Sequence, residues 1–181
     1  MLKICATLIL TTLSGMLVYS QELSRSANYM QLAMEKYQSM DAKAALDLYS
    51  MAIEADPTNH EAYFWRAIMK RKVEGAAAAI SDYDKAISLF PDPKYYNNRG
   101  VDKSLLGMYQ SAISDYYQAL KLKPDYGDAM FNMGYSYYEL GKTDSTCFYL
   151  GKAVALNHSM AGQIMKEICK SGDDGIAPNT H

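Results

Sequence analysis

The sequence predicts an all-α protein, a solenoid of four helical hairpins that ends in a capping helix. The first observation is a repeat: the stretch AISDYDKAISLFPD at residues 79–92 returns as AISDYYQALKLKPD at residues 112–125. The second is the spacing of apolar residues at intervals of three and four within these stretches, which is the period of an amphipathic helix. A fixed period filled by helices predicts a repeat architecture in which neighbouring units bury a shared core.

The period extends in both directions and defines four units, residues 26–59, 60–92, 93–126 and 127–160. Each unit contains two helical stretches of about a dozen residues. Helix breakers separate the two stretches and lie at or near Met40, Gly75, Gly107 and Gly141. A proline closes each of the first three units, where it cannot continue a helix. Each unit is therefore predicted to be a helical hairpin.

Short side chains recur where the two helices of a hairpin face each other. On the first helices they are Ala33, Ala67, Gly100 and Gly134. Antiparallel helices approach closely only where side chains are short. The tyrosines that recur on the second helices, Tyr49, Tyr83 and Tyr116, are expected to fill the spaces between hairpins.

These patterns resemble the tetratricopeptide repeat, or TPR. One part of the resemblance is a large and a small residue four positions apart in each first helix, such as Tyr63 and Ala67. The other is a series of second-helix positions such as Ala79, Tyr83, Ala86 and Pro91. The resemblance implies a right-handed superhelix whose first helices line a concave groove for a protein or peptide partner. The fourth unit departs from the pattern at Thr146, Leu150 and His158, as is typical of the end unit of a solenoid.

The C-terminal end of the chain lies outside the repeats. Residues 161–170 are predicted to form the capping helix, with Ile164 and Ile168 on its apolar side. Residues 171–181 are polar and contain glycine and proline, so we expect a disordered tail there.

The N-terminal end has the features of a secretory signal peptide over residues 1–20. Lys3 precedes an apolar run over residues 4–18, and a cleavage site follows Ser20. Residues 21–25 then form a short linker. The alternative is a membrane anchor, but a run of about fifteen residues is shorter than the roughly twenty that a span needs. A leader that ends in Ser-Gln also resembles bacterial ones, so we expect an exported protein, periplasmic or secreted, without stable membrane insertion after cleavage.

Two cysteines follow the leader, Cys147 and Cys169. They are equally distant from the turn expected near His158, and residues equidistant from the turn of an antiparallel hairpin lie side by side. In an oxidising compartment this placement makes them candidates for a disulfide. The alternative is a pair of buried free thiols, which pack as small hydrophobic side chains.

No reactive constellation is visible in the sequence. The three histidines have neither metal-ligand nor acid–base spacing. No Gly-x-Ser-x-Gly motif and no glycine-rich phosphate loop occurs. The net charge of −2 comes without a basic stripe, which argues against a nucleic-acid partner. We therefore expect no catalytic residue, metal or cofactor, and we expect the recurring acids Asp82, Asp84 and Asp115 to face solvent.

The groove positions implied by the resemblance are apolar or aromatic at the ends of the groove and more polar in the middle. They are Met30, Met34, Tyr37, Phe64, Ile68, Arg71, Lys72, Lys94, Asn97, Phe131, Tyr135 and Tyr138. Phe64 and Phe131 are expected to be exposed and to contact the partner. The basic run of residues 70–72 either complements the dipole at the end of its helix or contacts a partner.

One known mode of partner binding is not expected. TPR proteins that bind a C-terminal carboxylate use a clamp of lysines, asparagines and an arginine. The corresponding positions here hold Met30, Met34, Trp65, Lys94 and Asn98. The sequence thus predicts a non-catalytic scaffold of the bacterial cell envelope that binds a peptide segment or a partner protein. The alternative is a self-associating structural component of an envelope or secretion complex, and the oligomeric state stays open.

Overall fold

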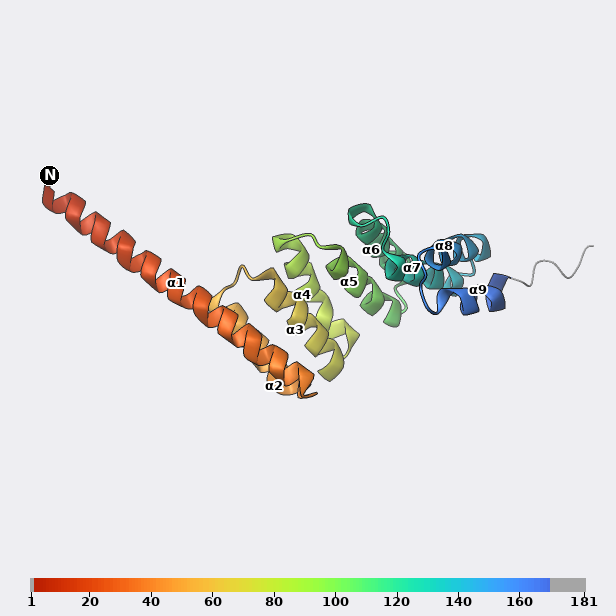
Figure 1. Cartoon of the computed structure of the whole chain (residues 1–181), viewed down its shortest axis with the longest axis horizontal. Helices are drawn as coiled ribbons and strands as arrows, with labels where there is room; N and C mark the ends of the chain where they lie inside the picture. The colour runs from red at the N-terminus through yellow and green to blue at the C-terminus, as the bar shows by residue number, and fades with distance from the viewer. Residues whose placement is uncertain (1, 170–181) are drawn as a thin grey trace, which may run out of the picture. The chain divides into compact units, whose positions relative to one another are not determined.

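Helical hairpins follow one another along the chain in the computed structural model, which describes residues 2–169 and, for residues 2–14, the backbone only. No strand occurs in this part of the chain, so the predicted all-α class is confirmed. The chain divides into two units, one ending at Phe90 and one beginning at Pro91, and each is described by itself. The bounds of the helices are as follows, and Figure 1 labels them: α1 Leu2–Gln38, α2 Ala42–Ala55, α3 His60–Val73 and α4 Ala76–Leu89 in the first unit; α5 Pro93–Leu105, α6 Tyr109–Leu122, α7 Gly127–Glu139, α8 Thr143–Ala155 and α9 Ala161–Cys169 in the second.

Consecutive helices pack in pairs within each unit. In the first unit α1 packs on α2 and α3 on α4, and α2 also contacts α3. In the second unit the pairs are α5 with α6 and α7 with α8, while α6 contacts α7 and α9 contacts α8. Within a unit, a hairpin thus buries one face between its own helices and another against the next hairpin, as in a stacked repeat.

Helix α1 is longer than the hairpin helix that the repeat predicts. It continues upstream through residues 21–25 and through the predicted leader. No proline or glycine interrupts residues 21–38, and Arg25 Nη1 lies 2.7 Å from Glu22 Oε1, one turn away on the same face. Within the described residues, no helix has the length and apolar character required to cross a membrane. The predicted tail, residues 171–181, lies outside the part of the chain that the structure describes.

Capping side chains fix the starts of several helices. Asp41 accepts a hydrogen bond from the Ala44 amide at 3.0 Å at the start of α2. Asn59 does the same for the Ala62 amide at 3.1 Å at the start of α3. Each satisfies an amide that the helix itself leaves without a partner. The turns inside the hairpins contain one residue with positive φ each: Met40, Gly75, Gly107 and Gly141.

Gly100 allows the closest approach between the helices of the third hairpin. A Cβ atom there would lie 2.6 Å from Cε1 of Tyr116, well inside van der Waals contact. The Tyr116 ring is 1% exposed, and its hydroxyl lies 3.2 Å from Ser104 Oγ, so the ring has little room to move. The predicted close approach at a short first-helix residue is confirmed here. Tyr116 is buried, and it packs against Gly100 of its own hairpin as well as in one cluster with Met133 of the next hairpin.

Replacing Gly100 by alanine is therefore expected to destabilise the protein. Alanine gains about 1 kcal/mol of helix propensity over glycine, but overpacking a closed core costs about 1–3 kcal/mol. We expect a net loss of up to about 2 kcal/mol in the free energy of unfolding, measured by urea denaturation. Gly162→Ala in α9 is the control, because the nearest atom to its new Cβ is Val154 Cγ2 at 4.0 Å, and this variant should be stabilised. Equal stabilisation of both variants would contradict the packing argument.

Buried ion pairs join the helices of the second hairpin. The Asp82 carboxylate is 4% exposed and accepts hydrogen bonds from Arg66 Nε at 2.8 Å and Nη2 at 2.7 Å. Lys70 Nζ lies 3.0 Å from the same carboxylate. This ion pair is a third explanation for the lysine at position 70, besides the helix dipole and contact with a partner. The expectation that Asp82 faces solvent is wrong, because the carboxylate points into the hairpin toward two cations.

The same network recurs in the third hairpin. Asp115 is 3% exposed, and its oxygens lie 2.6 Å from Arg99 Nη2 and 2.8 Å from Lys103 Nζ. The solvent-facing prediction is wrong for Asp115 for the same reason. Charged groups of opposite sign compensate one another there, which is the condition for burying a carboxylate.

Two fully buried tyrosines differ in what their hydroxyls contact. The Tyr49 hydroxyl has no hydrogen-bond partner among the described residues, although its ring stacks on Trp65 with 6.5 Å between ring centroids. The Tyr116 hydroxyl contacts Ser104. Tyr49→Phe is therefore expected to raise the free energy of unfolding by about 1 kcal/mol, and Tyr116→Phe to lower it by about as much. Urea denaturation of both variants checks this pair, and a loss in both would show that the Tyr49 hydroxyl is satisfied in solution.

The same tyrosines predict a loss of stability at alkaline pH. Burial raises the pKa of Tyr49 and of Tyr116 to about 12, whereas an unfolded tyrosine titrates near 10. Between these values the folded protein keeps protons that the unfolded chain has lost, so stability is complete below about pH 10 and falls as the pH rises toward about 12. By about pH 11 we expect each tyrosine to have cost about 1 kcal/mol of stability. Urea midpoints at about pH 9 and about pH 11 should show this loss, and Tyr49→Phe should make it smaller.

Candidate functional site

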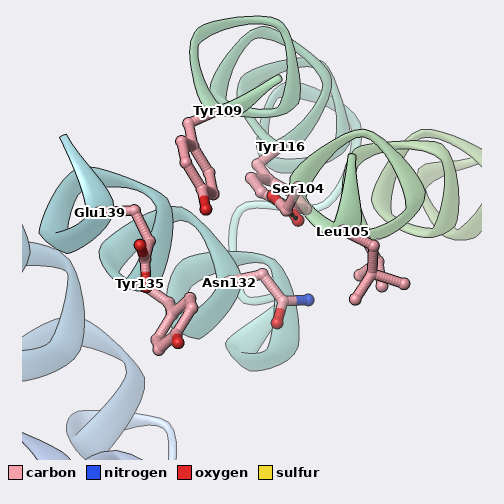
Figure 2. A pocket seen from close by; sticks show the side chains of 8 residues that line it. Ser104, Leu105, Tyr109, Tyr116, Asn132, Tyr135 and Glu139 are labelled. Atoms are coloured by element: carbon pink, nitrogen blue, oxygen red, sulfur yellow. Dashed lines mark hydrogen bonds between the residues drawn. The ribbon is translucent and has the colours of Figure 1, made fainter. Parts of the chain in front are cut away.

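A cleft opens in the second unit between the two first helices of its hairpins, α5 and α7. It encloses about 340 Å³. Figure 2 shows the side chains around this space. The lining residues are Val101, Ser104 and Leu105 from α5, Tyr109 and Tyr116 from α6, and Asn132, Tyr135 and Glu139 from α7. We call this space the α5–α7 cleft.

The floor of the cleft is a set of mutually satisfied polar groups. Ser104 Oγ lies 3.2 Å from the Tyr116 hydroxyl and 3.0 Å from Ser136 Oγ. Asn132 Nδ2 donates a hydrogen bond to Asn97 Oδ1 at 3.1 Å across α5 and α7. These bonds hold the two helices in register and leave a preorganised surface.

The rim of the cleft carries one acid between two phenols. Desolvation and the charge and hydrogen bonding of Glu139 raise the pKa of Tyr109. The pKa of Tyr135 rises chiefly because its side chain hydrogen-bonds Glu139, and the charge of Glu139 adds to the effect. Glu139 thus shares the lining of the cleft with one phenol from α6 and one from α7. Opposite, Leu105 is 68% exposed and presents an apolar edge.

A second hollow lies on the other side of Tyr135. It measures about 550 Å³, and its lining residues are Tyr135, Tyr138, Thr143, Ile164, Glu167 and Ile168. The rings of Tyr135 and Tyr138 lie 6.2 Å apart and are 44% and 47% exposed. Tyr135 thus lines both spaces.

The predicted groove residues of the second unit divide into exposed and buried ones. Tyr135 and Tyr138 are exposed and line the two hollows, whereas Lys94 is exposed at the start of α5. Asn97 is buried under the cleft, where it accepts the hydrogen bond from Asn132. Phe131 is 8% exposed and stacks on His158 with 4.3 Å between ring centroids, so the prediction that it is exposed is wrong.

The predicted groove residues of the first unit also pack largely against one another. Phe64 is 8% exposed and contacts Trp65 edge-on at 5.3 Å between ring centroids, so its predicted exposure is wrong as well. Tyr37 packs on Trp65 at 5.8 Å, and Lys72 Nζ lies 4.6 Å from the centre of the Tyr37 ring. The remaining predicted positions of this unit are Met30, Met34 and Arg71, which are half-buried, and Ile68, which is buried.

Both phenylalanine predictions failed for one physical reason. Neighbouring aromatic side chains and segments cover the two rings. Trp65 and α4 cover Phe64, and the loop around His158 with α9 covers Phe131. Alanine at either position is therefore expected to disturb packing rather than a partner contact alone.

The most informative lining residues are ones that the sequence analysis did not select. Leu105 ends α5, and Tyr109 begins α6 on the far side of the turn at Gly107. A groove defined by first helices alone leaves out any residue at the start of a second helix. The sequence did contain a feature that could have identified them. The turn between Leu105 and Tyr109 is short, so both residues must lie at the same end of the hairpin.

Metal binding has no evident site in this part of the molecule. Residues 15–169, whose side chains the structure describes, contain no group of three or more histidine, cysteine or acidic side chains placed to hold a metal ion.

Comparison with known families finds tetratricopeptide repeats in the chain. A TPR repeat model matches residues 105–141, and a tetratricopeptide repeat model matches residues 128–157. Tetratricopeptide repeat protein 6 of Homo sapiens is 30% identical over 128 residues, which cover 66% of this chain and 25% of that protein. The chain spans about a quarter of the length of the curated relatives that it matches.

Solved structures show the same fold. The crystal structure of the MamA protein superposes with a TM-score of 0.72 at 22% identity, covering 81% of this chain and 83% of MamA. The first TPR domain of Spaghetti (RPAP3), bound to the HSP90 peptide SRMEEVD, superposes with a TM-score of 0.64 at 23% identity, covering 66% of this chain and 95% of that domain. The chain therefore contains tetratricopeptide repeats and has the fold of TPR solenoids.

Proposed function

We propose that this protein is a non-catalytic interaction module that binds a segment of a partner protein in the α5–α7 cleft. The observation that carries the proposal is the combination of a hydrogen-bonded floor with exposed aromatic and apolar side chains at the mouth. Preorganised concave surfaces lined in this way are typical binding sites for peptides, because little ordering is needed on binding. The floor residues use their polar groups on one another, which leaves recognition to the rim.

Site-specific photo-crosslinking in the native cells tests this proposal. A photoreactive amino acid at Leu105, which is 68% exposed at the cleft, is expected to capture a discrete partner. The matched control is Tyr117 on α6, which is 58% exposed and does not line the cleft. Equal capture from both positions, or none from Leu105, would contradict the proposal. Capture of a second copy of this chain through Tyr117 alone would favour the self-associating alternative.

We also propose that the protein acts in the bacterial cell envelope after export and cleavage of residues 1–20. The support is the composition of the leader, with Lys3 before an apolar run and small residues before Gln21. N-terminal sequencing of the protein isolated from its native cells is expected to begin at Gln21. A mature chain that still carries residues 4–18 would favour the anchored alternative.

The occupant of the cleft is expected to differ from the acidic peptide bound by the RPAP3 domain. That peptide, SRMEEVD, contains three acidic residues. In this chain the clamp positions hold Met30, Met34, Trp65, Lys94 and Asn98. The only ionisable acid or base in the cleft lining other than tyrosine is Glu139, which repels a carboxylate.

A further inference from the structure

We propose that the α5–α7 cleft selects a segment that carries a lysine or arginine flanked by apolar side chains, with Glu139 as the counter-charge. This inference deepens the proposed function and rests on it. It names the chemistry of the partner that the cleft fits, and three features of the lining support it.

The first feature is charge. The lining residues include one carboxylate, Glu139, and no lysine or arginine. No lysine or arginine of the described residues forms an ion pair with Glu139, in contrast to Asp82 and Asp115. The adjoining hollow adds a second acid, Glu167, and again no cationic side chain. A concave site lined by one sign of charge attracts a ligand of the opposite sign.

The second feature is the pair of phenols beside Glu139. Tyr109 and Tyr135 line the cleft together with Glu139, and Figure 2 shows the three side chains at its mouth. Aromatic rings next to a carboxylate provide faces on which an ammonium or guanidinium group can rest. The protein already uses this contact elsewhere, since Lys72 Nζ lies 4.6 Å from the centre of the Tyr37 ring.

The third feature is the apolar edge of the cleft. Val101 and Leu105 of α5 supply this edge, and Leu105, which lies across the cleft from Glu139 (Figure 2), is 68% exposed. The volume of about 340 Å³ suits one long side chain with part of its neighbours, at the lower end of the range for ligand pockets. A partner segment with a cationic side chain beside Glu139 and apolar side chains against Leu105 therefore matches the lining in both size and polarity.

Selection from a random peptide library displayed on phage tests the inference with the purified full chain as bait. Selected peptides are expected to be enriched in lysine or arginine next to apolar residues. The peptide with the highest affinity is then synthesised with its cationic residue intact and with norleucine in its place. Both peptides are titrated against the parent protein, Glu139→Gln and the control Asp144→Asn, which removes an exposed acid of α8 outside the cleft.

The expected result is a coupling between Glu139 and the peptide cation. Because Glu139 is exposed, Glu139→Gln should weaken binding of the cationic peptide by about fivefold and leave the norleucine peptide unaffected. Asp144→Asn should change neither affinity. Added salt should weaken the parent complex more than the Glu139→Gln complex. Circular dichroism of Glu139→Gln checks that its fold is intact.

Three results would overturn the inference. They are a selected set without enrichment in lysine or arginine, equal effects of Glu139→Gln on both peptides, and failure of the parent to select any peptide. The photo-crosslinker at Leu105 distinguishes failure of this inference from failure of the proposed function. A partner captured at Leu105 together with peptides that lack cations removes the inference and leaves the interaction module in place.

Discussion

Replacing Asp115 by asparagine is expected to lower the free energy of unfolding by about 3 kcal/mol, because it removes the buried carboxylate that Arg99 and Lys103 share. Arg99 and Lys103 approach the carboxylate to 2.6 and 2.8 Å, and their side chains are only 16% and 15% exposed. Asparagine keeps the shape of aspartate, but it removes the charge and replaces one of the two accepting oxygens by an amide group that donates. Urea denaturation of the variant measures the loss.

The matched control is Asp125→Asn, which removes the same charge from an exposed turn. Exposed acids of this kind contribute little to stability, so we expect a change of less than about 0.5 kcal/mol. If both variants lose the same amount, or if Asp115→Asn is neutral, the network does not stabilise the hairpin in the way that its geometry indicates.

The fourth repeat supplies a second control. Its residues at the positions equivalent to Arg99, Lys103 and Asp115 are Met133, Tyr137 and Tyr149. The rings of Tyr137 and Tyr149 stack with 5.5 Å between centroids, so an aromatic pair replaces the ion pair. The triple variant Arg99→Met, Lys103→Tyr and Asp115→Tyr should therefore recover most of the loss, because well-packed apolar groups often replace a buried ion network at little cost. A triple variant less stable than Asp115→Asn would show that the two hairpins are not interchangeable.

The fold could be predicted because its signals repeat. The fixed period placed Gly100 opposite the second helix of its hairpin, and the structure packs it against the Tyr116 ring. Helix propensity, short residues and turn residues all indicate the same helical hairpin, and a structure is predicted reliably from sequence when such independent features agree. The individual charges were predicted less well. Asp82 and Asp115 share a helix face with residues expected in water, and only their cationic partners on the preceding helix show that they are buried.

The candidate site could be predicted only in part. Tyr135 and Tyr138 follow from the resemblance, because the position of a residue on a first helix determines its side of the hairpin. Phe131 occupies a similar position but is covered by His158 and α9, which the repeat pattern does not position. Tyr109 enters the cleft from the start of a second helix. Exposure depends on which neighbouring segment covers a residue, and a one-dimensional period does not contain that information.

The terminal hairpin supplies the other large effect that we expect. The structure joins Cys147 of α8 to Cys169 at the end of α9, with 5.8 Å between their Cα atoms and a sequence separation of 22. Closing a loop of this length reduces the entropy of the unfolded chain and contributes about 3 kcal/mol in the chain-entropy model. The double variant Cys147→Ala and Cys169→Ala is therefore expected to lose about this amount.

Amide hydrogen exchange can show which helices lose stability when the disulfide is removed. α9 has few other anchors: Ile164, Met165 and Ile168 pack against the cluster around Phe131 and Leu150, and Ala161 is its one buried residue. Amides of α9 should therefore exchange faster in the double variant, while those of α5 and α6 keep the protection of the parent, because neighbouring units of a repeat are coupled but can open separately. Reduction of the parent should reproduce this pattern, and reduction of the variant should change nothing. Peptide mapping without reductant that recovered both cysteines as free thiols, or α9 amides equally protected in parent and variant, would show that the bond does not hold this helix in place.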